Sequence, residues 1–205
     1  DKSVQPWYGN RYAKTLVTAA NLATRTIEYE GPLKDKDGKD VEVRVISASK
    51  EGDMTGKLGW KLDLVTPAGT AMGERMVVPN LFDGNRLLGI SRIPNNSDPC
   101  NVGGNGWLME IDPFTGGRID SGIFGINGDG VIDNKDAVAG TGDNPSRYPS
   151  GKRTDGSLNP VVIIPGKNGN LIEGSNQDDK IEGVPTPVTG LGAKRVAWRE
   201  ILRDG

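Results

Sequence analysis

Short segments in which apolar and polar residues alternate, each ended by Gly, Pro or Asn, recur along this chain of 205 residues. Alternation with period two is typical of a half-buried strand, because successive side chains of a strand point to opposite faces. The segments are 40–46, 60–64, 75–79, 86–91, 106–111 and 118–120. Such strands with glycine-rich turns predict a mainly β, antiparallel fold with little helix, as a sandwich, a barrel or a propeller. We find no internal repeat that selects among the three.

The segments between these strands are less regular. Residues 34–39 carry Asp-Gly at their centre and predict the turn of a hairpin that leads into strand 40–46. Residues 14–27 fit either a short helix or an extended segment. Residues 140–190 are rich in turn residues and predict a loop-rich surface excursion, interrupted by one strand at 160–165. Apolar and polar residues alternate again over 195–202, which predicts a terminal strand. We expect the whole chain, residues 1–205, to form a single β-rich region.

Composition excludes several classes of function. The chain has no histidine, which excludes Ser-His and Cys-His catalysis and histidine-ligated metals. One cysteine, Cys100, cannot form an internal disulfide or a CxxC zinc site. A net charge of −2 with scattered basic residues provides no stripe for nucleic acid. No stretch approaches the ~20 apolar residues that span a bilayer, so we expect no transmembrane segment.

One acidic loop, residues 125–136, has the residue pattern of a calcium site. Calcium loops of the EF-hand kind place oxygen ligands at positions 1, 3, 5, 7, 9 and 12, with glycine at position 6. With Asp136 as position 12, oxygen-bearing residues fall at positions 3, 5, 7, 9 and 12, and Gly130 falls at position 6. The predicted Ca²⁺ ligands are Asn127, Asp129, Val131 through its carbonyl, Asp133 and Asp136.

Position 1 of this loop departs from the pattern, because Gly125 stands where an aspartate is expected. The missing ligand would be water or an outside carboxylate such as Asp120 or Asp143. Five aspartates and one lysine between Asp120 and Asp143 give a local charge of −4, which a cation would relieve. The alternative is an ordinary Asn-Gly/Asp-Gly turn with solvated acids.

Several stretches together resemble the PilC/PilY family of type IV pilus tip-associated adhesins and biogenesis factors. They are residues 73–79, 97–100 and 103–117, with agreement in the flanks at 3–9, 59–64 and 198–200. The match is strongest over 59–136. The resemblance is to the C-terminal region of the family, and it implies a fold that is part of a modified β-propeller with long loops. It also implies that the acidic loop is the family's calcium site, with ligands at Asn127, Asp129, Val131 and Asp133.

The resemblance implies a non-enzymatic extracellular module at the pilus tip on the cell surface, exported through the periplasm and outer membrane. Its implied work is pilus biogenesis, control of retraction through calcium, and surface adhesion in twitching motility. The implied partners are minor pilins and a host or surface receptor. The alternative is a glycan-binding or glycan-hydrolysing β protein with paired carboxylates, for example Glu110 and Asp112, and exposed tryptophans.

Three tryptophans and the cysteine each have two interpretations. Trp60, Trp107 and Trp198 lie on alternating segments, where packing is commoner than a ligand platform. Glu110 and Asp112 alternate with Met109 and Ile111, which predicts a solvent-exposed face for the two acids. Cys100 is either a free thiol in a tight turn or the partner of a cysteine in upstream chain, since an exported protein meets oxidising conditions.

Overall fold

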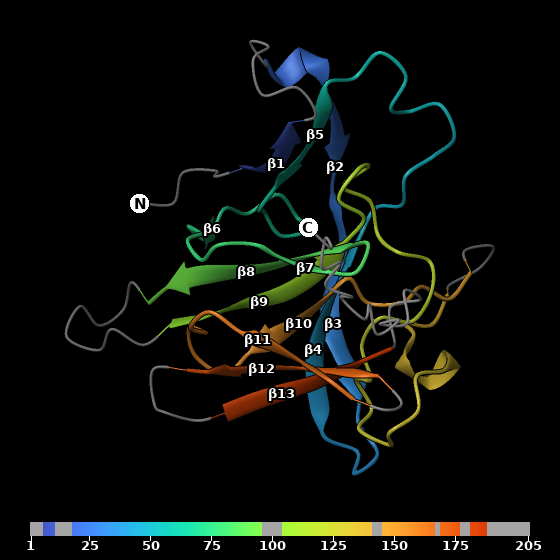
Figure 1. Cartoon of the computed structure of the whole chain (residues 1–205), viewed down its shortest axis with the longest axis vertical. Helices are drawn as coiled ribbons and strands as arrows, with labels where there is room; N and C mark the ends of the chain where they lie inside the picture. Colours follow the sequence, from blue (N-terminus) through green and yellow to red (C-terminus); the bar gives the residue numbers. More distant parts are fainter. Residues whose placement is uncertain are drawn as a thin grey trace, which may run out of the picture.

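Three β-sheets make up the regular structure of the residues described here (Figure 1). The computed structural model describes residues 6–10, 18–95, 104–140, 145–166, 169–176 and 181–187. The large sheet has the order β3 (Ile27–Lys34), β4 (Asp40–Ile46), β10 (Gly151–Thr154), β9 (Gly104–Ile111), β8 (Arg86–Pro94), β6 (Arg75–Met76), with β7 (Leu81–Asp83) also on β8. The smaller sheets are β1 (Pro6–Asn10), β5 (Gly59–Asp63), β2 (Leu22–Arg25), and β11 (Val162–Pro165), β12 (Asn170–Ser175), β13 (Ile181–Thr186).

The prediction of a mainly β, antiparallel fold with little helix is confirmed. Helix within the described residues is confined to two 3₁₀ turns, η1 (Ala19–Asn21) and η2 (Asn134–Asp136). Neither has the length of a membrane-crossing helix. All strand pairs between these elements are antiparallel except β2 with β5, which is parallel. That the three sheets belong to a modified propeller stays a prediction.

Local turn chemistry sets the hairpins. The turn between β3 and β4 is the predicted one: Gly38 has φ 79, and Lys34 pairs with Asp40 across it. A two-residue turn joins β7 to β8, with Gly84 at φ 63 and Asp83 opposite Arg86. Positive φ is reached without steric cost only by glycine, which explains why these tips carry it.

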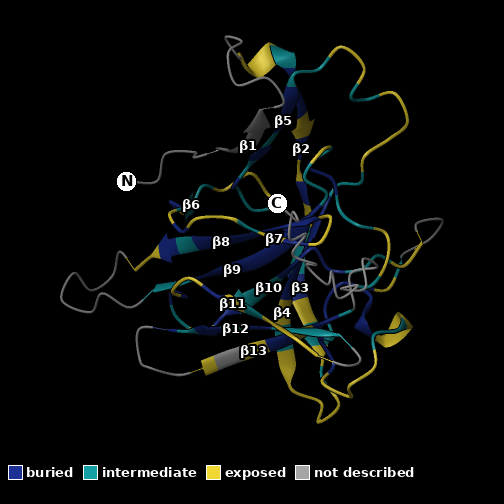
Figure 2. Ribbon diagram, viewed as in Figure 1, coloured by how far each residue is buried: buried dark blue, intermediate teal, exposed yellow. Residues whose placement is uncertain are grey.

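The central strands of the large sheet, β8 and β9, are buried on both faces. Neighbouring residues of β8 and β9 belong to different hydrophobic clusters: Leu88 and Leu108 to one, Leu87 and Met109 to the other. The first cluster also holds Ile172 of β12, and the second holds buried residues of β2 and β5. The β11–β12–β13 sheet and the β1–β5–β2 sheet thus pack in two separate clusters on opposite faces of the central strands, which are dark in Figure 2.

Residues 140–190 contain more strand than the single one predicted at 160–165. Four strands, β10 to β13, fall in this segment, and β10 lies between β4 and β9 in the large sheet. Leu158, Val161, Ile172 and Val184 from this segment are buried in the core. At the other predicted strands, β6 is only Arg75–Met76, and residues 118–120 form no strand. The predicted strand 195–202, Trp198 and Cys100 lie outside the described residues.

The tryptophan and acid predictions have opposite outcomes. Trp60 and Trp107 are each 1% exposed, so packing is confirmed for both. The exposed face predicted for Glu110 is wrong, because Glu110 is 0% exposed. β9 is flanked by β8 and β10 and covered on both faces, so alternation along it separates two buried sides.

Candidate metal-binding loop

The acidic loop, residues 125–136, lies between β9 and β10 and ends in η2. Backbone bonds attach it at two points. The Gly125 N–H donates to the Pro185 carbonyl at 3.0 Å, and the Lys36 N–H donates to the Asn127 carbonyl at 2.8 Å. The loop is therefore joined both to β13 and to the turn between β3 and β4.

Three side chains in the loop fold it through bonds to nearby backbone. The Oδ1 atoms of Asn127, Asp129 and Asp133 accept from the backbone N–H two residues onward, at 2.9, 2.9 and 2.8 Å. Short polar side chains commonly form such turns. Gly128 and Gly130 between them have φ 71 and 84, a conformation that glycine adopts at least cost. The sequence pattern thus corresponds to a tightly wound loop.

Asp136 closes the loop from inside the protein. It is 0% exposed, and its Oδ1 and Oδ2 accept from the backbone N–H groups of Asn127 and Asp133 at 2.9 and 3.0 Å. The carboxylate predicted as the twelfth-position ligand therefore connects the beginning of the loop to its last turn. A buried carboxylate is tolerated there because both its oxygens are hydrogen-bonded.

The chemistry of the donors fits calcium, which prefers carboxylate, amide and backbone oxygens. The loop in this structure is nevertheless held by its own contacts. The Asn127 amide donates to Asp129 Oδ2 at 3.1 Å, and Lys135 Nζ lies 3.7 Å from the same oxygen. Across the described residues, no group of three His, Cys, Asp or Glu side chains is arranged to hold a metal ion. A cation would have to replace the lysine and the amide donor at Asp129.

The first ligand position stays without a side-chain oxygen. A Cβ added at Gly125 would lie 3.0 Å from Pro185 Cγ, so a side chain fits only if the proline shifts slightly. Asp120, one candidate for an outside ligand, is bonded to Arg118 at 2.9 Å. Asp143, the other, lies outside the described residues.

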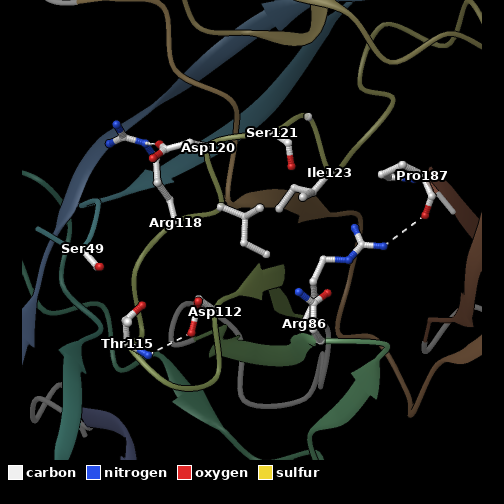
Figure 3. Close-up of a pocket in the computed structure, with 12 residues that line it drawn as sticks. Ser49, Arg86, Asp112, Thr115, Arg118, Asp120, Ser121, Ile123 and Pro187 are labelled. Atoms are coloured by element: carbon white, nitrogen blue, oxygen red, sulfur yellow. Dashed lines mark hydrogen bonds and ion pairs between the residues drawn. The ribbon is translucent and has the colours of Figure 1, made fainter. Parts of the chain in front are cut away.

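A pocket of ≈ 520 Å³ next to Arg86 brings together acids relevant to the alternative of a glycan hydrolase (Figure 3). Asp112 and Asp120 both line it. Asp112 Oδ1 accepts the N–H groups of Phe114 and Thr115 at 2.7 and 3.0 Å, which fixes the turn after β9. Glu110 is not among the lining residues. The two acids named as a candidate pair are thus a turn-forming residue and a buried one.

Sequence reasoning missed a buried ion cluster around Arg86. Its guanidinium donates to Glu110 Oε2 and Asp83 Oδ2, each at 2.8 Å, and to the Pro187 carbonyl at 3.1 Å. Burial raises the pKa of Glu110 to about 8, Arg86 opposes this, and Asp83 adds to it. The only sequence signal was the charged pair flanking the Gly84-Asn85 turn, since Glu110 is distant in the chain.

The comparisons with known proteins agree on one family. No protein-family profile matches the chain. A type IV pilus biogenesis factor PilY1 homolog from Xylella fastidiosa is 36% identical over 208 residues, covering 99% of this chain and 15% of that protein. Type IV pilus biogenesis factor PilY1 from Pseudomonas aeruginosa is 36% identical over 81 residues, 40% of this chain and 7% of that protein.

The fold comparison points the same way. The crystal structure of the Pseudomonas aeruginosa PilY1 C-terminal domain superposes with a TM-score of 0.71 at 21% identity, covering 91% of this chain and 38% of that one. The resemblance to the PilC/PilY family is therefore confirmed. This chain is a member of the PilY1 family of type IV pilus proteins and spans a small part of the length of its curated relatives.

Proposed function

We propose that this chain is a non-enzymatic, extracellular module of the type IV pilus machinery that acts in pilus biogenesis. The observation that carries the proposal is 36% identity along 99% of the chain to a type IV pilus biogenesis factor. Its place would be the cell surface at the pilus tip, with minor pilins as partners. A surface or host receptor would be the partner of its adhesive function.

The architecture proposed for this module is part of a modified β-propeller. The support is the fold similarity over 91% of the chain, which corresponds to 38% of the solved C-terminal domain. Sheets of three strands have two edges each, and edge strands in soluble proteins are normally covered. Further blades beside the β11–β12–β13 sheet would cover such edges.

Calcium is the proposed ligand of the acidic loop, with Asn127, Asp129, the Val131 carbonyl and Asp133 as direct ligands and Asp136 as the closing carboxylate. The backbone N–H of Asn127 already donates to Asp136 Oδ1, so this one carboxylate joins both ends of the loop. Cation binding would exchange repulsion between the acids for coordination, and it would stabilise the native state by ~2.7 kcal/mol at a hundredfold excess over Kd.

The mechanical consequence follows from the attachments of the loop. Because Lys36 and Pro185 bond to it, a calcium-filled loop would tie the β3–β4 turn to β13 more firmly. A stiffer connection between two sheets is a way for calcium to oppose the force of pilus retraction. With glycine at position 1 we expect affinity near the weak, extracellular end of the range, ~10⁻⁴–10⁻³ M.

The test of this function is surface piliation in the bacterium that encodes the chain. Deletion of the coding region is expected to abolish surface pili, and the wild-type gene is expected to restore them. The double variant D129N/D133N keeps the turn-forming oxygens but removes two charges, and it is expected to restore pili that fail to withstand retraction at low calcium. The matched control is D37N, an exposed aspartate of the β3–β4 turn. Normal piliation after deletion would contradict the proposal.

A further inference from the structure

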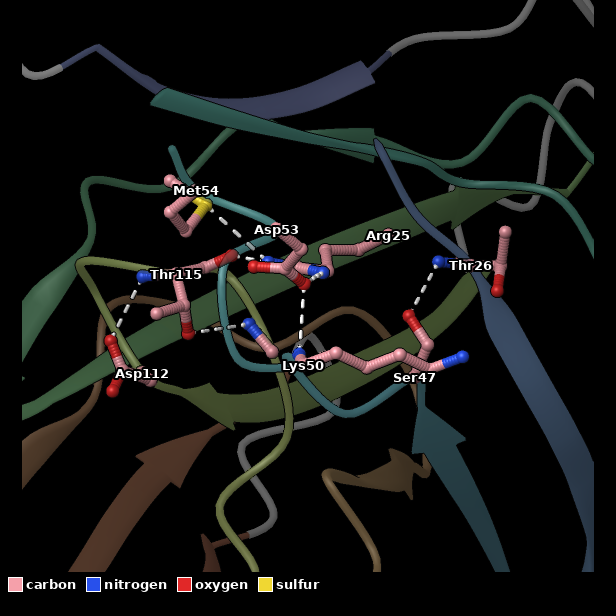
Figure 4. A network of polar contacts seen from close by, with 9 residues as sticks. Arg25, Thr26, Ser47, Lys50, Asp53, Met54, Asp112 and Thr115 are labelled. Carbon is pink, nitrogen blue, oxygen red and sulfur yellow. Dashed lines mark hydrogen bonds and ion pairs between the residues drawn. The ribbon is translucent and has the colours of Figure 1, made fainter. Parts of the chain in front are cut away.

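A second pocket, of ≈ 700 Å³, opens beside the ends of β2, β3 and β4 and is distinct from the acidic loop. Its walls are formed by β2, the start of β3, residues 47–57 after β4, and Arg118 with Pro145 and Arg147. Figure 4 shows the polar network on one wall, where Arg25, Lys50 and Asp53 lie near one another. Ligand pockets in proteins commonly have volumes of this order.

The charge of this pocket is one-sided. Among the described residues that line it are five cationic side chains and two carboxylates, whereas the chain as a whole is slightly acidic. The cations are Arg25, Lys50, Lys57, Arg118 and Arg147, and the acids are Glu28 and Asp53. Such a concentration of one sign in a concave surface attracts ligands of the opposite charge.

The two carboxylates are already engaged. Asp53 Oδ2 accepts from Arg25 at 2.6 Å and from the Lys50 backbone N–H at 2.9 Å, and the bond from Arg25 lowers the pKa of Asp53. Glu28 Oε2 is shared by Arg147 at 3.0 Å and Arg118 at 3.4 Å. Arg118 is also bonded to Asp120 at 2.9 Å, so Glu28 is mainly the partner of Arg147.

The lysines of the pocket remain available. Within the described residues Lys50 forms no salt bridge, and Lys57 Nζ donates to the Ala20 carbonyl at 3.1 Å. Besides the bond from Arg25, the charge of Lys50 contributes to the lowered pKa of Asp53, so a bound anion would compete with Asp53 for Lys50 and with Glu28 for Arg147.

The neutral part of the lining narrows the class of anion. Thr24, Thr26 and Ser47 supply hydroxyl groups, and none of the lining residues that the structure describes is aromatic. Stacking on aromatic rings, which single-stranded nucleic acids use, is therefore not available here. Hydroxyls interspersed with cations match a ligand that itself alternates hydroxyl and carboxylate groups.

We propose that this pocket binds acidic oligosaccharides that carry carboxylate groups. The proposal extends the adhesive part of the proposed function and rests on it for its biological meaning. The pocket shares no residue with the acidic loop, so we expect binding of the oligosaccharide to be independent of calcium. Lys50 and Arg147 would contact the carboxylates, and the threonine and serine hydroxyls would contact the sugar.

The experiment is calorimetric titration of the chain with tetragalacturonic acid, in EDTA and again in calcium. Its methyl ester serves as the neutral ligand and hexaglutamate as an anion without sugar hydroxyls. The variant K50E is expected to weaken binding about five- to tenfold, as a rim charge reversal should. R147Q is a second variant, on another wall. K39E is the matched control, because Lys39 is exposed on the β3–β4 turn and does not line the pocket.

Binding of the acid form alone, weakened by K50E and R147Q and unchanged by K39E, would support the proposal. Absence of binding at millimolar ligand would overturn it, as would equal binding of hexaglutamate or an equal effect of K39E. Surface piliation is measured separately in the same variants. Normal pili with lost oligosaccharide binding would separate this pocket from the role in biogenesis.

Discussion

Replacing Glu110 by glutamine should change how the stability of this protein depends on pH. Glu110 is 0% exposed, its Oε2 lies 2.8 Å from Arg86, and its Oε1 is buried with no hydrogen-bond partner among the residues that the structure describes. Burial raises its pKa from 4.5 to about 8, Arg86 lowers it, and the nearby carboxylate of Asp83 raises it further. One guanidinium thus faces two acids, and burial favours the protonated form of Glu110 below its raised pKa of about 8.

The sign of the effect follows from the order of the two pKa values. Below pH 4.5 the carboxyl is protonated in both the folded and the unfolded chain. Between 4.5 and about 8 the folded protein holds a proton that the unfolded chain has released, so stability falls as pH rises. At ~1.4 kcal/mol per pH unit this interval corresponds to a loss of at most about 5 kcal/mol.

The measurement is urea unfolding of wild type and E110Q between pH 5 and 9. Glutamine has nearly the same shape and cannot titrate, so E110Q is expected to lose most of this slope and to exceed the wild type in stability at pH 9. The control is E42Q, because Glu42 is exposed on β4. A wild-type stability that rises through this range, or a slope that E110Q retains, would refute the reasoning.

Two further substitutions test a buried ion pair and a close packing contact. R44M is expected to lower the free energy of unfolding in urea by about 3–5 kcal/mol. Arg44 bonds both oxygens of Glu74 at 2.7 Å, and its loss leaves a carboxylate that is 3% exposed without its charge partner. A loss below 1 kcal/mol would contradict this. G116A is expected to cost about 2–4 kcal/mol, because Gly116 has φ +68 and its added Cβ would overlap the Trp60 ring. G38A has a similar φ with open space around it, so it isolates the backbone strain, and an equal cost for both variants would argue against the overlap.

The sequence predicted strands well where alternation is long and uninterrupted. β4, β5, β8 and β9 all lie at predicted segments, and the turn at Gly38 was predicted from Asp-Gly. β11 lies at the predicted segment 160–165, whereas β10, β12 and β13 were missed because Gly or Pro within them interrupts the alternation. Their assignment depends on pairing with distant strands, such as β10 with β4 and β9, which a local pattern does not contain.

Among the candidate sites, too, features built from local contacts could be predicted and features built from distant segments could not. The acidic loop could be predicted because its side-chain bonds span only two or three residues, except for the bond that Asp136 makes to Asn127. The Glu110 cluster and the cation-rich pocket were missed because their members come from segments that are far apart in the sequence. Alternation along β9 indicated an exposed face for Glu110, but whether a face is covered depends on the other sheets.

Direct titration of the chain with calcium tests the central claim, that the acidic loop is a calcium site of a type IV pilus module. We expect heat of binding with one site per chain and Kd in the range ~10⁻⁴–10⁻³ M, together with a rise in Tm. D129N/D133N is expected to weaken binding at least tenfold, whereas D37N is expected to leave it unchanged. No heat of binding and an unchanged Tm at millimolar calcium would contradict the claim and leave an acidic turn held by its own hydrogen bonds.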